Sequence, residues 1–149
     1  MASFLDILAP SRVPDTSGVG RRSGPADLES SIRHDIQSLL NVRRPPDSIA
    51  EGFVELPRSI LMFGLRDYAF AEMENREQRE RVARHIEEVL SAFEPRLAGI
   101  RVESQDPERM ETVVKFRIFA SIRGPGGDLQ SDFHNTFEWT TGHHEVSTG

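Results

Sequence analysis

The sequence predicts an α+β fold, with two main helices first and then a small, mostly antiparallel sheet of three to four strands. Two observations lead to this prediction. Before Glu94, apolar residues recur at three- and four-residue steps in two segments, which is the period of an amphipathic helix. From Ile100 onward they alternate every second residue, which is the period of a strand, and turn residues separate the alternating segments. The 149 residues suffice for one domain, which we assign to residues 26–149.

The first predicted helix spans Ala26 to about Asn41. Its apolar residues form a single stripe made of Leu28, Ile32, Ile36, Leu39 and Leu40. Asn41 suits the C-cap position, and Pro45 and Pro46 forbid the helix to continue. Residues 42–73 then combine chain breakers with many apolar side chains. We expect them to be irregular but packed, with a turn of helix near residues 59–63.

The second predicted helix runs from an N-cap at Asn75 to Phe93. Its buried stripe consists of Val82, Ile86, Val89, Leu90 and Phe93. The opposite positions carry Arg and Glu at i,i+4 spacing, which is typical of a solvated helix face. Pro95 disfavours helical backbone at the preceding residue, so we expect the helix to end there.

The sheet is predicted from four alternating segments. Ile100–Glu103 reads as a first strand, and residues 112–123 form the longest one, with Val114, Phe116, Ile118, Ala120 and Ile122 on one face. The Gly-rich residues 124–128 reverse the chain. The return strand places Leu129, Ser131, Phe133, Asn135, Phe137 and Trp139 on one face, and a short strand follows at residues 143–146.

Residues 1–25 are predicted to be a flexible N-terminal peptide and linker, because residues 10–25 are rich in Pro and Gly and nearly devoid of apolar side chains. A short apolar cluster precedes the linker and contains Phe4, Leu5, Ile7 and Leu8. It either folds back onto its own domain, has no role, or is a tethered peptide that docks in a groove of a partner.

Composition excludes several classes of function. The net charge of −6 argues against a nucleic-acid-binding protein, and the absence of cysteine excludes disulfides, thiol nucleophiles and Cys-ligated zinc. No apolar run approaches the ~18 residues of a membrane span, so no direct membrane insertion is expected. The N-terminus lacks a basic region and Asp6 interrupts its apolar run, which is unlike a signal peptide. We therefore expect a cytoplasmic protein.

Motifs for chemistry are missing. The chain has no phosphate-binding loop, no dinucleotide fingerprint, no zinc-protease motif and no nucleophile elbow. His143 and His144 are neighbours in a strand, so their side chains point to opposite faces and cannot share a metal ion. We therefore expect no metal, no cofactor and no catalytic residues.

One short segment carries a specific signal. In Glu94-Pro95-Arg96, proline fixes an extended turn, so that Glu94 and Arg96 project to the same side as a pair of opposite charges. The pair either ties the end of the helix to the sheet or forms a rigid charged projection that binds another protein through the planar guanidinium of Arg96. In the second interpretation, replacing either charge leaves the fold intact and weakens partner binding.

Four segments in order resemble one family. Leu39-Leu40-Asn41-Val42-Arg43-Arg44-Pro45, Ser59-Ile60-Leu61-Met62-Phe63-Gly64-Leu65-Arg66-Asp67-Tyr68, Phe93-Glu94-Pro95-Arg96-Leu97 and the leading Ser3-Phe4-Leu5-Asp6-Ile7-Leu8 are similar to blocks of the TssE proteins of the type VI secretion system. These share a family with tailed-phage baseplate wedge proteins called lysozyme-like. Phe63 and Arg66 depart from the Tyr and Pro of the family pattern.

The resemblance implies a cytoplasmic baseplate subunit of a phage-like contractile tail. It implies a wedge shared with TssF, TssG and TssK, and contact with the sheath built from TssB and TssC, whose assembly it helps to initiate. The family links its Glu-Pro-Arg signature to that interaction, which points to Glu94, Pro95 and Arg96 as partner-binding residues. Phe4, Leu5 and Leu8 are the candidate contacts of the N-terminal peptide.

The residues support the same interpretation in physical terms. A small open sheet leaves an edge, and an exposed edge is either guarded or used for strand addition. Strand addition needs no catalytic constellation. The alternatives are a lysozyme-type glycoside hydrolase acting on peptidoglycan, with Glu94 as its acid, and a module that binds a small molecule in an apolar pocket.

Overall fold

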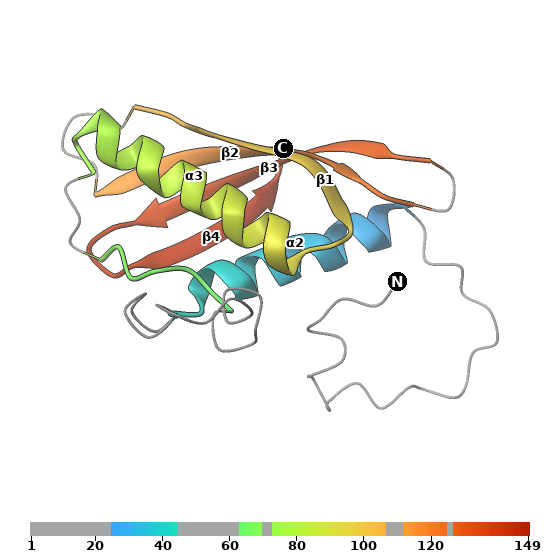
Figure 1. Cartoon of the computed structure of the whole chain (residues 1–149), viewed down its shortest axis with the longest axis horizontal. Helices are drawn as coiled ribbons and strands as arrows, with labels where there is room; N and C mark the ends of the chain where they lie inside the picture. The colour runs from blue at the N-terminus through green and yellow to red at the C-terminus, as the bar shows by residue number, and fades with distance from the viewer. Residues whose placement is uncertain (1–24, 45–62, 70–72, 107–111, 125–126) are drawn as a thin grey trace, which may run out of the picture.

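The computed structural model describes residues 25–44, 63–69, 73–106, 112–124 and 127–149. Two helices come first, α2 (Pro25–Asn41) and α3 (Arg76–Phe93). Four strands follow, namely β1 (Leu97–Ser104), β2 (Val113–Ile122), β3 (Leu129–Glu138) and β4 (His143–Thr148). They form one antiparallel sheet in the order β1-β2-β3-β4 (Figure 1). The predicted α+β class is confirmed.

Several predictions fall on residues that are not described. The flexible peptide and linker at residues 1–25, which include Phe4, Leu5 and Leu8, lie outside the described residues except for Pro25. The turn of helix near residues 59–63 also lies outside them except for Phe63. The assignment of residues 26–149 to a single domain therefore stays a prediction.

The described elements form two layers, with both helices against the same face of the sheet. Helix α2 packs on β4 and α3 packs on β1. Alternate residues of β2 and β3 point toward the helices and are buried, which follows from the two-residue period of a strand. The largest fully buried side chains include Phe116, Phe133, Phe137, Ile32, Ile36, Ile86 and Leu90.

Helix α3 shows how its sequence sets its limits. Asn75 has extended backbone dihedrals and its side chain accepts a hydrogen bond from the Glu77 N–H at 2.9 Å, which makes it the N-cap as predicted. The backbone N–H of Glu94 still donates to the Leu90 carbonyl at 2.9 Å, but Glu94 itself has left the helical conformation. Pro95 follows at once, so the chain turns directly into β1.

The described part of the irregular segment is anchored to the end of α2. Arg43 and Leu65 form an isolated parallel bridge, in which the Leu65 N–H donates to the Val42 carbonyl at 2.8 Å. Gly64 has a φ of 109°, a conformation that side chains with a Cβ rarely adopt. A Cβ built there would lie 2.2 Å from the Val42 carbonyl oxygen. These described residues therefore pack against the end of α2, and glycine is what permits the close approach; residues 45–62 and 70–72, on which the rest of the prediction falls, lie outside the described residues.

Candidate interaction surfaces

The Glu94-Pro95-Arg96 corner joins α3 to β1, and its two charges face inward. Arg96 Nε lies 2.7 Å from Glu94 Oε1 and Arg96 Nη2 lies 2.6 Å from Glu94 Oε2, a bidentate pair. Arg96 Nη2 also donates to Asp35 of α2. Glu94, Arg96 and Asp35 are 3%, 6% and 7% exposed. We call these three residues the buried ion cluster.

The buried ion cluster connects all three parts of the fold that meet at this corner. Asp35 comes from α2, Glu94 follows α3 and Arg96 precedes β1. Burial alone would lower the pKa of Arg96, but the hydrogen bonds and charges of Glu94 and then Asp35 outweigh it and raise the pKa above the ordinary value. Glu94 and Arg96 project to the same side, as predicted. Because they point inward and bond to Asp35, their geometry agrees with the interpretation in which the pair ties the end of α3 to the sheet.

The same geometry does not suit an acid catalyst. Both carboxylate oxygens of Glu94 accept hydrogen bonds from the guanidinium of Arg96, so in this arrangement neither oxygen is free to reach a glycosidic oxygen. Glu94 also lines neither of the two pockets described below. Pro95, by contrast, is exposed at the tip of the corner.

The sheet has two edges, and at β4 the side chains of α2 bond to His144 and to the Val146 carbonyl, while the Val146 N–H and both backbone groups of Thr148 have no partner among the described residues. The Asn41 side chain accepts a hydrogen bond from the His144 N–H at 2.9 Å and donates one to the His144 carbonyl at 2.7 Å. A side-chain amide carries the same donor and acceptor as a peptide group, so Asn41 takes the place of a neighbouring strand. Arg33 also donates to the Val146 carbonyl at 3.3 Å.

The edge at β1 carries one side-chain hydrogen bond, from Glu87 of α3. The Gln105 N–H donates to the Lys115 carbonyl, so in this antiparallel register the backbone groups of Val102 and Ser104 point away from β2. The Val102 N–H donates to the Glu87 carboxylate of α3 at 2.7 Å. Within the described part of the chain, the Val102 carbonyl and both backbone groups of Ser104 have no hydrogen-bond partner.

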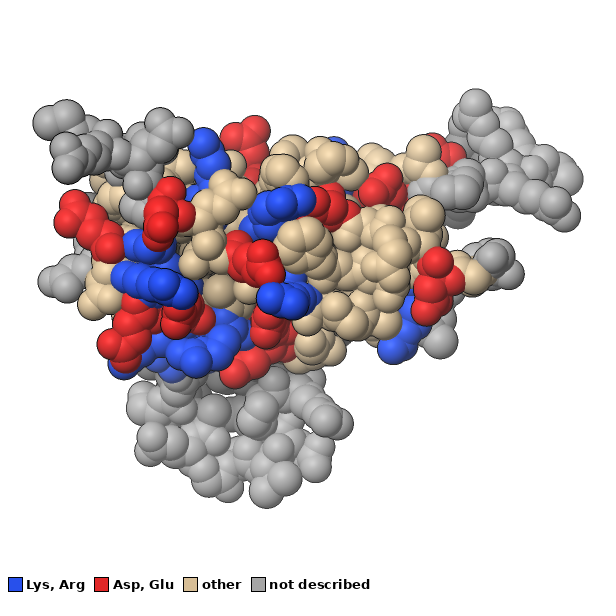
Figure 2. Space-filling model, turned by 90° about the horizontal axis from the view of Figure 1, so that it is seen from above, with Lys and Arg blue, Asp and Glu red and all other residues tan. Residues whose placement is uncertain are grey.

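A charged groove lies beside this edge, between α3 and β1, with a volume of about 590 Å³. Figure 2, seen from above relative to Figure 1, shows Arg interspersed with Asp and Glu over one end of the molecule and a largely neutral surface beyond it. The residues that line the groove are Arg76, Arg79, Glu80, Ala83, Arg84, Arg101, Val102, Glu103, Ser104 and Asp106.

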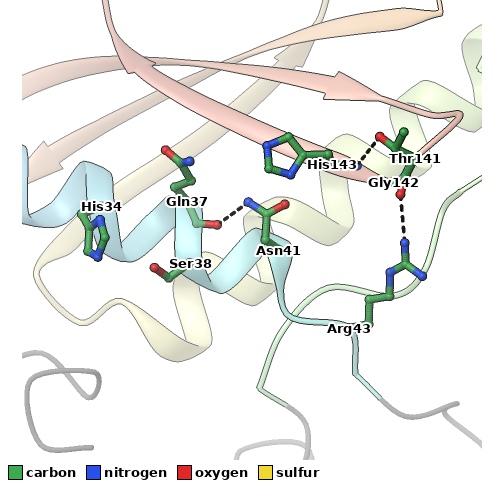
Figure 3. Close-up of a pocket in the computed structure, with 8 residues that line it drawn as sticks. All are labelled: His34, Gln37, Ser38, Asn41, Arg43, Thr141, Gly142 and His143. Atoms are coloured by element: carbon green, nitrogen blue, oxygen red, sulfur yellow. Dashed lines mark hydrogen bonds between the residues drawn. The ribbon is translucent and has the colours of Figure 1, made fainter. Parts of the chain in front are cut away.

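A second, smaller pocket of about 420 Å³ lies where the end of α2 meets the turn between β3 and β4. Figure 3 shows it lined by polar side chains, among them Asn41 and Arg43. Arg43 is already engaged, because it donates to the Thr141 carbonyl at 3.0 Å and pairs with Asp67 at 3.0 Å. No three His, Asp or Glu residues within the described ranges gather in a way that could hold a metal ion.

The face of the sheet opposite the helices is polar where it is described. Arg117 lies 4.9 Å from the ring centroid of Phe119 and pairs with Asp132 at 2.5 Å. Lys115 and His134 extend the same face and are exposed. His143 is exposed while His144 is buried, so the two histidines point to opposite faces, as predicted.

Three residues that matter for these surfaces were not singled out as site residues from the sequence. Asp35 lies 61 positions before its partner Arg96, and Asn41 lies 103 positions before His144, so no local pattern connects either pair. Glu87 sits among other charged residues of α3, and only the position of β1 gives it a role. Asn41 had a helix-capping signal, and it does bond to the Gln37 carbonyl at 2.8 Å.

Comparison with known families gives one match. The family model described as baseplate wedge protein gp25 matches residues 26–125, which includes α2, α3, β1 and β2. Comparison with the curated proteins and with the solved structures found no significant match. Neither described helix is long and apolar enough to cross a membrane.

Proposed function

This chain belongs to the family of baseplate wedge protein gp25, and we propose on this premise that it is a structural baseplate subunit of the type VI secretion system. In this role it joins the baseplate wedge to the contractile sheath and helps to initiate sheath assembly. A structural role in a phage-like baseplate follows from the family itself. The assignment to the type VI secretion system is supported by the four sequence segments that resemble TssE proteins.

One structural observation carries the proposal, namely that the sheet ends in an edge with unpaired backbone groups at Val102 and Ser104. Such an edge can accept a strand from another chain, and the main-chain hydrogen bonds then provide affinity without a catalytic site. A structural subunit needs this kind of surface. The partners that the proposal names are TssF, TssG and TssK in the wedge and TssB and TssC in the sheath, all reached in the cytoplasm.

The candidate partner-binding residues fit the proposal in two different ways. Glu94 and Arg96 are buried, so they act by holding β1 in place against α2 and α3, while the exposed Pro95 is available for direct contact. Phe4, Leu5 and Leu8 belong to an apolar peptide that supplies a second contact through its linker. A tethered second contact raises the effective concentration of the first.

Co-purification from the native host tests the proposal. An affinity-tagged full chain is expected to retain TssF and TssG, and to retain TssB and TssC when sheath assembly is permitted. The variant for comparison is the tagged chain with Arg96→Met, which removes the cation of the buried ion cluster. It is expected to retain less of each partner when equal amounts of protein are compared. Retention of none of these proteins by the unsubstituted chain would refute the proposed function.

The proposal also assigns the chain no catalytic activity. Purified chain incubated with peptidoglycan is expected to release no fragments, and a Glu94→Gln variant is expected to behave the same way. Fragment release by the unsubstituted chain that Glu94→Gln abolishes would favour the glycoside hydrolase instead.

A further inference from the structure

Arg79 occupies a position on α3 where the helix otherwise buries apolar side chains. Val82, Ala83 and Ile86 follow it along the buried face of the helix, and Arg79 itself is only 3% exposed. A buried guanidinium is costly unless hydrogen bonds and a negative charge satisfy it. Arg79 is therefore expected to have every N–H group bonded, and its contacts depart from that expectation at one place.

The hydrogen bonds of Arg79 leave one edge of its guanidinium incomplete. Nη1 donates to the carbonyls of Met73 and Glu74 at 2.9 and 2.8 Å, which fixes the orientation of the planar group. Nη2 donates to Asp106, whereas Nε has no hydrogen-bond partner among the described residues. A carboxylate that meets Nε and Nη2 together forms a bidentate pair, as Glu94 does with Arg96 in the same chain. The contact of Asp106 supplies only half of such a pair.

Asp106 is also loosely held. Its side chain is 89% exposed, whereas the side chain of Arg79 is 4% exposed. Water solvates an exposed carboxylate well, so Asp106 can leave the guanidinium at little cost when another carboxylate replaces it. The contact between Arg79 and Asp106 therefore marks a place where a carboxylate from another molecule can bind with one more hydrogen bond than Asp106 makes.

The cations around Arg79 are spread along the charged groove and do not converge on one point. Arg76, Arg79 and Arg84 line its α3 side, and Arg101 lines its β1 side. At the helical rise, the eight positions from Arg76 to Arg84 correspond to about 12 Å along the axis of α3. A single inorganic anion cannot meet both of these residues. A peptide segment with several acidic side chains can, which favours it as the occupant.

The pairing of these cations leaves them accessible to such a segment. Arg84 has no ion pair with any described residue. Arg101 pairs with Glu103, but their side chains are 73% and 49% exposed, so the pair is weak and open to exchange. Nucleic acid suits the groove less well, because acidic side chains line it too and the whole chain has a net charge of −6.

We propose that the charged groove binds an acidic segment of a partner protein through side chains, and that one carboxylate of this segment takes the Nε–Nη2 edge of Arg79 in place of Asp106. The groove lies along the first half of α3, whereas the Glu94-Pro95-Arg96 corner follows the opposite end of that helix. The proposed function does not require this site, and the probe used to test it is not a baseplate protein. Either can therefore fail without the other.

Titration of the isotope-labelled full chain with a short, end-capped oligoglutamate peptide tests the site. Nuclear magnetic resonance resolves the Nε–H signals of the arginines, and the Arg79 signal is expected to shift the most, with binding that weakens as salt is added. Oligoglutamine of the same length, inorganic phosphate and an oligothymidylate of the same length are the comparison probes, and each is expected to bind about tenfold or more weakly. An unshifted Arg79 signal, or equal binding of any comparison probe, would overturn the inference.

Two pairs of variants with matched charge changes test the residues. Asp106→Asn is expected to bind oligoglutamate about threefold or more tightly, because the competing carboxylate is gone, while Asp128→Asn, an exposed position outside the groove, changes binding by less than about 1.5-fold. Arg84→Gln is expected to bind about threefold or more weakly, while Arg81→Gln, which removes an Arg paired with Glu77, changes binding by less than about 1.5-fold.

Arg79→Gln removes the guanidinium edge itself and is expected to weaken binding at least about tenfold. Because Arg79 is buried and also holds the carbonyls of Met73 and Glu74, circular dichroism must show that this variant is folded. If it is not folded, the Asp106 and Arg84 pairs decide, since both positions are exposed. No gain in Asp106→Asn, or no loss in Arg84→Gln, would overturn the inference.

Discussion

Replacing Arg96 by Met removes the cation of the buried ion cluster and leaves an unbranched apolar side chain of similar length. Glu94 and Asp35, which are 3% and 7% exposed, then lose the guanidinium that they share, and Glu94 keeps only the hydrogen bond from the backbone N–H of residue 96, at 3.2 Å. Removing one partner of a buried pair costs about 3–5 kcal/mol, a large part of the ~5–15 kcal/mol that stabilises a domain. With all 149 residues counted, unfolding entropy is about 0.3 kcal/mol/K, so the melting temperature is expected to fall by about 10–16 °C.

Scanning calorimetry and urea unfolding measure this loss. The matched control is Arg123→Met, because Arg123 is exposed and only its contact to the Pro95 carbonyl, at 3.3 Å, is lost. It is expected to change stability by no more than about 0.5 kcal/mol. The triple variant Arg96→Met, Glu94→Gln, Asp35→Asn removes all three charges and is expected to recover most of the loss. A loss below about 1 kcal/mol for Arg96→Met alone would refute the reasoning.

Four further predictions follow from the described contacts. Burial, and then the charge of His143, lowers the pKa of His144 to about 3, so stability is expected to fall as pH drops from about 6.5 toward 3, and this slope should flatten in His144→Gln, as measured by pH-dependent urea unfolding. Asn41→Ala should cost about 2–4 kcal/mol and speed exchange of the His144 amide, whereas a loss under about 0.5 kcal/mol would contradict a stabilising role for the bonds between Asn41 and His144. Gly64→Ala should lower stability by more than about 2 kcal/mol, because the added Cβ would collide with the Val42 carbonyl oxygen; an unchanged melting temperature would contradict this expected loss. Deleting residues 1–10 should leave the melting temperature unchanged and reduce capture of TssF and TssG in pull-downs, and equal capture would argue against the tethered peptide.

The elements that repeat a local pattern were predictable from the sequence. The stripe of α3 was predicted from Val82 to Phe93, and Val82, Ile86, Val89 and Leu90 are indeed buried. The long strand was predicted at residues 112–123 and is observed at Val113–Ile122 with the expected face inward. These succeed because helix and strand periods are properties of consecutive residues.

The two-residue period predicts which face a side chain points to, but it does not by itself predict whether that side chain is buried. Leu129 was placed on the same face as Phe133 and Phe137, yet it is 46% exposed while those two are fully buried. The alternation sets the face correctly, but burial also depends on the neighbouring strands. Leu129 pairs with the buried Ile122 of β2 on one side, but the pairing of β4 ends at Phe133 and Thr148, so no described strand lies beside Leu129 on the other side.

The candidate site was predictable only in part, and the reason is the distance along the chain. The extended turn at Pro95 correctly predicted that Glu94 and Arg96 share a side, because that is local geometry. The inward direction of the pair depends on Asp35 in another helix. The capping of each sheet edge depends on whether Asn41 reaches β4 and Glu87 reaches β1. Such pairings are decided by tertiary packing, which no short window of sequence contains.

The contact between α2 and β4 also has a consequence for synthesis on the ribosome. The first described helix docks on the last described strand, through Asn41 and Arg33. Until β4 has emerged, α2 lacks these contacts, although Asp35 can already bond to Arg96 and Glu29 to Ser131, and β1, β2 and β3 can pair with their chain neighbours. A chain cut short before β4 would therefore hold α2 less firmly and become a target for chaperones and proteases before it could enter an assembly.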